Sequence, residues 1–482
     1  MQYHSTRGAS VWVDSAEAVL QGIAPDGGLY MPHSLPAFDW KACVAAQPME
    51  MSLQILSALL PEIPYMDRLV ENAYRGKFQT DELTPTVQAG PFTVVELFRG
   101  PTSAFKDVAL SMLPQLMTAA KQAKGMEEDI LILTATSGDT GKAALVGFRD
   151  VPGIRICVFY PDGGVSEVQR RQMVSQEGEN VAVCAVRGNF DDAQTGVKNI
   201  FAACSEKALP FRISSANSIN IGRLAPQIMY YFKAYRDLWQ RGTIRLGEEV
   251  NFSVPTGNFG DILAGYLAKL LGLPVGRLIC ASNANNVLTD FIRTGTYDRR
   301  RPLHKTQSPS MDILVSSNLE RLLYLMSGDT AMVSRLMKEL NEEGCYTVPA
   351  ELLAKIQAVF WAGSCDDTAG AEVIGRVWKA HGYLCDTHTA AGWKAAEDYV
   401  NQTSDTRPMA VLSTASPYKF PAAVLSAIGG SCPGDEFRQM EQLEILTGVK
   451  IPQNLANLQQ KPQLHSDVID KDQMLSFVLQ LS

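Results

Sequence analysis

The chain has 482 residues, too many for one ordinary hydrophobic core, so two or three domains are expected. Hydrophobic residues make up 46% of the sequence and charged residues 20%, as in an ordinary globular protein. The formal net charge of −8 argues against a nucleic-acid or anionic-membrane surface, because both need clustered positive charge. A bound phosphate would have to be held locally, by backbone N–H groups and a few basic side chains.

Signals for targeting and for metal binding are weak throughout. The first residues lack the apolar core of a secretory signal, and no run of 18 apolar residues occurs, so a cytoplasmic protein is expected. The nine cysteines are scattered, with no Cys-x-x-Cys pair, and are expected to be reduced and buried. The six histidines show no metal-ligand spacing, so no metal site is predicted.

The N-terminal region is predicted to be a mixed extension covering residues 1–95. Turn signals occur at residues 25–28, and the apolar residues between Ser52 and Leu60 recur at helical spacing. Residues 92–98 then read as a short buried strand.

Lys106 follows this strand in a mostly uncharged stretch, Pro101-Thr102-Ser103-Ala104-Phe105-Lys106-Asp107, and an apolar helix turn comes after it. An amine at such a junction loses solvation, which favours its neutral, nucleophilic form and the formation of a Schiff base with a carbonyl compound. The alternative from this stretch alone is a surface lysine at a helix start, since most lysines are solvated.

Strands and helices then alternate along the chain. Buried strands are predicted at residues 129–136, 154–160 and 181–186, with helices after them, and Ser166 with Gln169 resembles a capping box. Strands separated by glycine-rich turns and helices predict parallel α/β layers.

The second half continues this pattern less regularly. Strands are predicted at residues 250–254 and 409–412, and residues 320–382 are largely helical. Residues 294–309 carry several cations and few apolar residues, which indicates a mobile or solvated connection or a segment covering a substrate. Beyond Gly429 the chain is polar and is interpreted as a peripheral tail.

The loop Gly257-Asn258-Phe259-Gly260-Asp261 lies between a strand and a helix. Unpaired N–H groups and the positive end of the helix dipole meet there, and glycines let the backbone approach a phosphate. The alternative is a plain strand-to-helix turn. The Asp261 carboxylate is expected to point away from a bound dianion and to cap nearby N–H groups.

Two further polar stretches are candidate binding loops. Ser137-Gly138-Asp139-Thr140-Gly141-Lys142 resembles a nucleotide loop, but Thr136 and Ala143 replace the glycine and hydroxyl residue of the Walker pattern, which excludes it. A second cluster stands at a predicted helix start, where one cation could bind a phosphate in forked geometry. Its alternative is helix capping plus a surface arginine, and it comprises Asn217, Ser218, Asn220 and Arg223.

Taken with the other motifs, residues 100–107 resemble the cofactor-lysine segment of threonine synthases, which belong to the fold type II pyridoxal-phosphate enzymes. Matches to this family recur in order along nearly the whole chain, at residues 21–30, 96–261, 310–314 and 413–420. The resemblance implies two parallel-sheet α/β domains with an N-terminal mixed and helical extension. The predicted division is an extension at residues 1–95, a smaller domain at 96–205 and a larger domain at 206–482.

The resemblance also assigns roles to residues. It implies that Lys106 carries pyridoxal 5'-phosphate, that Gly257, Asn258, Phe259, Gly260 and Asp261 hold the cofactor phosphate, and that Thr414 contacts the pyridine nitrogen. It places the substrate carboxylate at Ser137, Gly138, Asp139 and Thr140, and the substrate phosphate at Asn217, Ser218, Asn220 and Arg223. Many relatives of the fold type carry Asn at the position of Asp139, so an acid near the ring leaves the protonation there open. Lys419 and His388 are weaker candidates for anion contact, and the alternative for His388 is a turn residue without such a role.

The expected activity is conversion of O-phosphohomoserine and water to threonine and phosphate. The partner is then a small-molecule substrate, without nucleic acid or membrane, for a monomer or homodimer. Two alternatives remain: another fold type II enzyme, such as a dehydratase, sulfhydrylase or phospho-lyase, and a cofactor-binding homologue without synthase activity.

Overall fold

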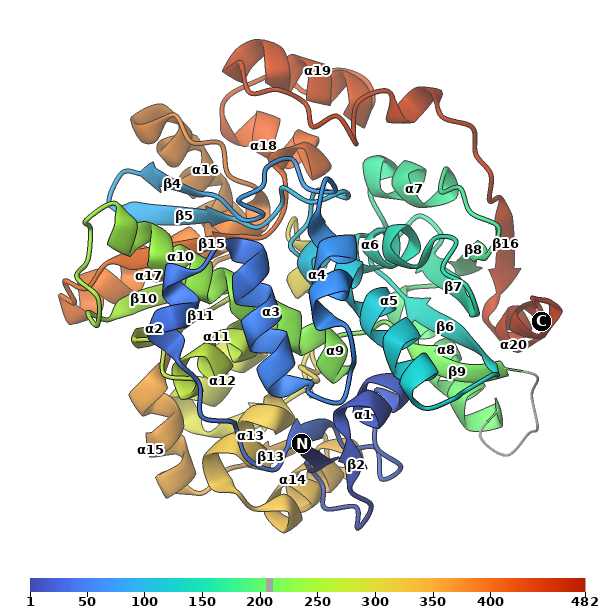
Figure 1. The fold of residues 1–482 in the computed structure, drawn as a ribbon. Helices are drawn as coiled ribbons and strands as arrows, with labels where there is room; N and C mark the ends of the chain where they lie inside the picture. The colour runs from blue at the N-terminus through green and yellow to red at the C-terminus, as the bar shows by residue number, and fades with distance from the viewer. Residues whose placement is uncertain (205–210, 482) are drawn as a thin grey trace.

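The computed structural model describes residues 1–204 and 211–481. The N-terminal region forms a small antiparallel sheet in the order β2-β1-β3 and four helices. Figure 1 shows the third and fourth of these helices near the centre of the view, with the first below them and the second to the left. The elements are β1 (Gln2–Ser5), β2 (Val13–Asp14), α1 (Ser15–Gln21), β3 (Tyr30–Pro32), α2 (Trp40–Ala45), α3 (Pro48–Leu59) and α4 (Met66–Tyr74).

A six-stranded sheet in the order β14-β11-β10-β15-β5-β4 forms the larger half, and only β4 is antiparallel to its neighbour. Its strands are β4 (Thr86–Ala89), β5 (Phe92–Glu96), β10 (Val250–Pro255), β11 (Val275–Ser282), β14 (Phe360–Ser364) and β15 (Met409–Ser413). The helices around it are α9 (Ile221–Leu224), α10 (Ile228–Gln240), α11 (Gly260–Leu270), α12 (Val287–Thr294), α16 (Asp367–His381) and α17 (Thr387–Thr403).

Successive side chains of these strands alternate between two hydrophobic cores. Leu278 and Cys280 belong to the core shared with α10 and α11, whereas Ile279 and Ala281 belong to the core under α16 and α17. The reason is the two-residue period of a strand, which sends neighbouring side chains to opposite faces of the sheet. Because both faces are covered, these strands read as continuous apolar runs.

A five-stranded parallel sheet in the order β16-β8-β7-β6-β9 forms the smaller half. Its strands are β6 (Asp129–Ala135), β7 (Ile154–Pro161), β8 (Val181–Arg187), β9 (Phe211–Ser215) and β16 (Asp467–Asp470). The helices associated with it are α5 (Lys106–Ala123), α6 (Asp139–Phe148), α7 (Glu167–Val174), α8 (Phe190–Cys204) and α20 (Met474–Gln480). The capping box predicted for Ser166 and Gln169 opens α7 and is confirmed.

Further helices complete the molecule. They are α13 (Leu319–Ser327), α14 (Thr330–Glu342), α15 (Ala350–Val359), α18 (Pro421–Ala427) and α19 (Glu436–Thr447), with a two-stranded ribbon of β12 (Thr296–Asp298) and β13 (Cys345–Thr347). No helix of residues 1–204 and 211–481 combines the length and apolar character needed to cross a membrane.

The C-terminal region differs from the predicted peripheral tail. The segment after Gly429 forms α19, runs along the outside of the molecule past α7 and adds β16 to the edge of the smaller sheet, where β16 pairs with β8 (Figure 1). The segment is peripheral as predicted, but the interpretation as a tail is wrong, because it contains helices and a paired strand. Its polar composition concealed the strand, because an edge strand with exposed side chains has no apolar run to mark it.

Sheet membership also crosses the predicted domain boundaries. β9 and β16, both beyond residue 205, pair in the smaller sheet, whereas β5 lies within the larger sheet next to β15. The three-part division of the chain stays a prediction. The pairing shows that the chain passes between the two sheets three times, within residues 97–128, 216–249 and 414–466.

The connection at residues 294–309 is not solvated along its whole length. Asn283 donates hydrogen bonds to the Thr306 hydroxyl at 2.8 Å and to Asp312 at 2.7 Å, and Ser308 is buried. These contacts fix the second half of the segment, so the interpretation as a mobile or solvated connection is wrong there. The Asn283 side chain that makes these contacts precedes the segment and gives no signal within it.

Candidate active site

Lys106 is the first residue of α5 and follows the carboxyl end of β5. Its Nζ lies 3.4 Å from the hydroxyl oxygen of Ser310. Burial lowers the pKa of this amine to about 8; the Asp139 carboxylate opposes the shift, while the charges of Lys419 and Arg223 add to it. About a tenth of such amines are neutral at pH 7, far more than for a solvated lysine, so nucleophilic attack on a carbonyl is accessible.

Asp107 fixes the loop before this lysine. Its carboxylate accepts hydrogen bonds from the Thr102 N–H at 2.8 Å and the Thr102 hydroxyl at 2.5 Å. The loop also pairs with the end of β15, because the Phe105 N–H donates to the Thr414 carbonyl at 2.8 Å. Thr414, predicted from a distant motif, therefore lies beside the lysine segment.

The loop at residues 257–260 joins β10 to α11. Within residues 1–204 and 211–481, the backbone N–H groups of Gly257, Asn258, Phe259 and Gly260 donate to no other group. Phe259 has a φ of 61°, which turns the chain sharply at the start of the helix. A Cβ at position 257 would lie 2.6 Å from the Ser310 carbonyl oxygen, so only glycine fits there. Free N–H groups at a helix N-terminus suit a phosphate.

The Asp261 carboxylate contacts two tyrosines and not the N–H groups that it is predicted to cap. Its carboxylate accepts hydrogen bonds from the hydroxyls of Tyr230 at 2.6 Å and Tyr231 at 3.0 Å, and α11 has no side-chain cap. Burial raises the pKa of Asp261 to about 7, against the effect of the two tyrosine hydrogen bonds. The expectation that it caps N–H groups is wrong, because the tyrosines of α10 reach it from the neighbouring helix.

Asp139 at the start of α6 lies in a buried ion pair with Lys419, whose Nζ is 2.6 Å from the carboxylate. Gln169 donates a second hydrogen bond at 2.9 Å. Burial alone would raise the pKa of Asp139, but the charges of Lys419 and Lys106 outweigh it and hold that pKa well below its usual range. Asp139 is therefore anionic, and Lys419 serves as its counter-charge rather than as a free anion ligand.

Replacing Lys419 with Met is expected to lower the free energy of unfolding by about 3 kcal/mol, because it leaves a buried carboxylate without its ion-pair partner. Since the folded pKa of Asp139 is depressed, its contribution is present above the unfolded pKa and is lost as the pH falls. Urea unfolding at pH 7, where this contribution is fully present, measures the effect.

The double variant Lys419→Met/Asp139→Asn should recover much of this stability. Lys394→Met is the control, since Lys394 pairs with Asp398 at a partly exposed position and should cost less than about 1 kcal/mol. Equal losses in the two lysine variants would contradict the assignment.

Arg223 is a buried cation on α9. Its Nη1 donates to the Ala216 carbonyl, its Nε has no partner, and no carboxylate of the described residues pairs with it. Burial lowers the pKa of Arg223 to about 10. An unpaired guanidinium inside a protein is costly unless an anion arrives, so this side chain suits a phosphate ligand.

The other members of the Arg223 cluster differ in whether their side chains are already bonded within the protein. Asn220 is fully buried; its side chain caps α9 at the Gly222 N–H and donates to the Val19 carbonyl, both at 2.8 Å. Asn217 and Ser218 are partly exposed, and a Cβ at Gly260 would lie 3.7 Å from that of Ser218. The cluster and the 257–260 loop are thus neighbours, whereas the Asn220 side chain is already used within the protein.

His388 is also committed to protein contacts. It is buried at the start of α17, with Nδ1 2.8 Å from Asp386 and Nε2 3.2 Å from the Ser310 backbone nitrogen. Neither ring nitrogen is left for an anion, so the interpretation of His388 as an anion ligand is wrong.

Ser310 was not singled out by the sequence as a site residue, although it stands in the 310–314 motif. It contacts the Lys106 amine through its side chain and Gly257 through its carbonyl, so it bridges the lysine and the loop. Asn318 is a second such residue: its backbone N–H and side-chain amide donate to the Asn258 carbonyl at 3.1 and 3.0 Å. In the sequence, only the residue types indicated these roles: a hydroxyl at Ser310 and an amide at Asn318, both before the helix that begins at Leu319.

These residues fit pyridoxal phosphate. An amine of lowered pKa faces the site, free N–H groups at 257–260 suit a phosphoryl group, and both contact the same serine. A single pyridoxal phosphate molecule must reach both the Lys106 amine and the loop at residues 257–260. Because Ser310 contacts both, the two lie close enough for this.

Three family profiles match the chain: "Threonine synthase N terminus" at residues 2–74, "Pyridoxal-phosphate dependent enzyme" at residues 80–414 and "Threonine synthase, C-terminal" at residues 389–477. The threonine synthase of Pseudomonas aeruginosa is 39% identical over 477 residues, covering 95% of this chain and 97% of that protein. Threonine synthase-like 1 of Homo sapiens is 38% identical over 434 residues, and the aligned region spans only 58% of its length.

Solved structures agree with the sequence relatives. The PLP-bound threonine synthase of Brucella melitensis superposes with a TM-score of 0.87 at 38% identity, covering 100% of this chain and 99% of that chain. Yeast threonine synthase gives a TM-score of 0.88 at 31% identity, covering 100% and 98%. The chain therefore belongs to the threonine synthase family of pyridoxal-phosphate-dependent enzymes.

Proposed function

We propose that the protein converts O-phospho-L-homoserine and water to L-threonine and phosphate, as a carbon–oxygen lyase acting on phosphates. One observation carries this proposal: two separate places suited to phosphate flank a single amine. The free N–H groups at residues 257–260 suit the cofactor phosphate, and the unpaired guanidinium of Arg223 suits a second phosphate on the substrate.

The second anion site favours this reaction over those of related enzymes. A dehydratase or sulfhydrylase acting on a substrate without phosphate has no use for a buried, uncompensated cation. Arg223 lies close enough to Lys106 for its charge to lower the pKa of the amine, so a substrate phosphate held there places the adjoining carbons near the lysine.

Bound pyridoxal phosphate supplies an electron sink for negative charge that develops on the substrate carbons. The Lys106 Nζ removes the proton from Cα and then moves protons at Cβ and Cγ, since an amine with a pKa of about 8 can both accept and donate protons near neutral pH. Arg223 holds the phosphate as it leaves Cγ, after which water adds at Cβ.

The loop at residues 137–140 is proposed to orient the substrate. Ser137 and Thr140 offer hydroxyls for the substrate carboxylate. Asp139 stays anionic near Lys106 and is paired with Lys419. Thr414 is proposed to face the pyridine nitrogen with a hydroxyl, which need not protonate that nitrogen and so tempers the electron sink.

A phosphate-release assay tests the proposal. Purified protein loaded with pyridoxal phosphate should release inorganic phosphate and threonine in equal amounts from O-phosphohomoserine, and it should form little keto acid from serine. It should also restore growth of a threonine auxotroph. Keto-acid formation without threonine would favour the dehydratase alternative, and cofactor binding without either product would favour the non-synthase homologue. Cytoplasmic location and a monomeric or homodimeric state stay predictions.

A further inference from the structure

Ser310 has three contacts that join different parts of the site. Its hydroxyl lies 3.4 Å from Lys106 Nζ, its carbonyl oxygen lies against Gly257, and its backbone N–H donates to His388 Nε2 at 3.2 Å. The residue stands in a short 3₁₀ turn, Pro309–Met311, which gives it no ladder of regular hydrogen bonds. Its position therefore depends on these few contacts.

The partners of His388 determine where its ring proton lies. A backbone N–H can only donate, so Nε2 must be the unprotonated acceptor for Ser310. The proton is then on Nδ1, which donates to the buried Asp386 carboxylate at 2.8 Å. Asp386 also accepts the Thr389 N–H at 3.0 Å, which fixes the carboxylate in turn. The chain Asp386–His388–Ser310 is thus oriented at each step.

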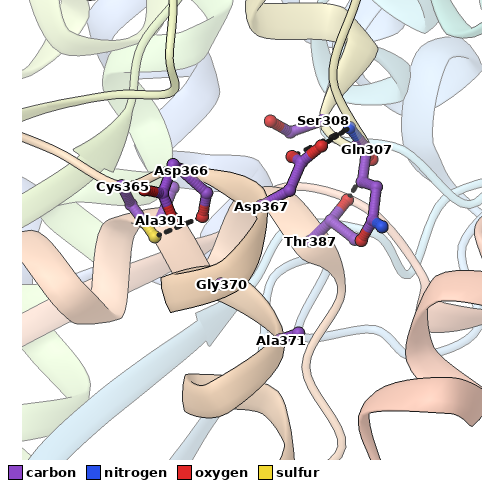
Figure 2. A pocket seen from close by; sticks show the side chains of 9 residues that line it. All are labelled: Gln307, Ser308, Cys365, Asp366, Asp367, Gly370, Ala371, Thr387 and Ala391. Atoms are coloured by element: carbon purple, nitrogen blue, oxygen red, sulfur yellow. Dashed lines mark hydrogen bonds between the residues drawn. The ribbon is translucent and has the colours of Figure 1, made fainter.

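A second set of contacts holds the residues just before Ser310. The Thr387 hydroxyl donates to the Gln307 carbonyl at 2.7 Å, and the Gln307 N–H donates to Asp367 at 3.0 Å, as Figure 2 shows. Helices α16 and α17 therefore hold Gln307 through Asp367 and Thr387. His388, also on α17, contacts Ser310 three residues further along the chain. A segment fixed on both sides can present the Ser310 hydroxyl in one place.

We propose that Ser310 is a positioning residue for the Lys106 amine and that His388, oriented by Asp386, holds Ser310 in that position. The inference rests on the proposed role of Lys106. A hydroxyl accepting a hydrogen bond from a protonated amine stabilises the charged form, because charge-assisted bonds are the stronger ones. The other charged groups that affect this amine are Asp139 on α6, Lys419 after β15, Arg223 on α9 and Asp107 on α5.

Spectroscopic pH titration of the holoenzyme tests the contact. In Ser310→Ala the pH midpoint of the visible cofactor band, which reports protonation of the Lys106 nitrogen attached to the cofactor, should fall by about 0.5 to 1 unit, since one hydrogen bond to the protonated form of that nitrogen is lost. The kcat should fall about tenfold with a smaller change in KM. Ser310→Thr, which keeps the hydroxyl, should restore the midpoint, and Ser476→Ala at an exposed position should change nothing.

Two substitutions of His388 separate its two contacts. His388→Asn keeps a donor for Asp386 but loses the acceptor for Ser310, so it should shift the midpoint as Ser310→Ala does. His388→Gln keeps an acceptor at the Nε2 position and should shift it less. The double variant Ser310→Ala/His388→Asn should show no further shift, because both changes remove one contact pathway. His465→Gln, at a histidine whose ring contacts the Gln176 carbonyl, is the control.

An unchanged midpoint in Ser310→Ala, or fully additive shifts in the double variant, would overturn the inference. If His388→Asn fails to fold, Ser310→Ala and Ser310→Thr still decide it. Failure of the proposed function is a separate outcome. If Lys106→Ala retains the visible absorption, Lys106 does not have its proposed role. If Ser310→Ala has normal absorption and an unchanged midpoint, only the proposed role of Ser310 is excluded.

Discussion

Replacing Lys106 with Ala is expected to abolish the visible absorption of the bound cofactor and to reduce turnover at least about 1,000-fold. The amine is proposed both to attach the cofactor and to move protons at three substrate carbons, and loss of a general acid–base alone costs about 100- to 10,000-fold. Absorption spectra and phosphate release measure the two effects.

Lys121 is the matched control for this prediction. It lies near the other end of the same helix α5, where it contacts the Gly153 carbonyl, so Lys121→Ala should keep both absorption and turnover. A Lys106→Ala protein that retains the visible band, or turns over within tenfold of the parent, would contradict the assignment of the cofactor lysine.

Replacing Arg223 with Ala is expected to lower kcat/KM for O-phosphohomoserine about 100-fold, with most of the loss in KM. Hydrogen bonds to a charged partner contribute about 1.5 to 3 kcal/mol, and Arg223 is the buried cation proposed to meet the substrate phosphate. Inhibition by inorganic phosphate should weaken in parallel. Steady-state kinetics over a range of substrate concentrations separates the two parameters.

The stability of an Arg223 variant separates binding from folding. Arg223→Met removes an unpaired buried charge, so it should leave the thermal midpoint without substrate unchanged or raised while abolishing stabilisation by added phosphate. Arg212→Ala, at an exposed position, is the control and should have normal kinetics. Normal kcat/KM in Arg223→Ala would exclude the substrate-phosphate role.

The α/β architecture could be predicted because buried parallel strands leave a local signal. Residues 129–135, 154–161 and 181–187 are covered on both faces, so each reads as an apolar run bounded by turns. Exposed edges leave no such signal, which is why β16 at residues 467–470 was interpreted as tail. Membership of a sheet is likewise decided by pairing over long distances, and β9 with β6 is an example.

The sequence by itself determined the residues that carry the proposed chemistry: Lys106, the loop at residues 257–260 and the cation Arg223. Their residue types and their places at ends of strands and starts of helices are local properties. Only the tertiary structure decided how each is used. Lys419 neutralises Asp139, two tyrosines bind Asp261, and His388 holds Ser310. These pairings join residues 30 to 280 positions apart. They are selected by burial and by charge balance, and both arise only when the chain is folded.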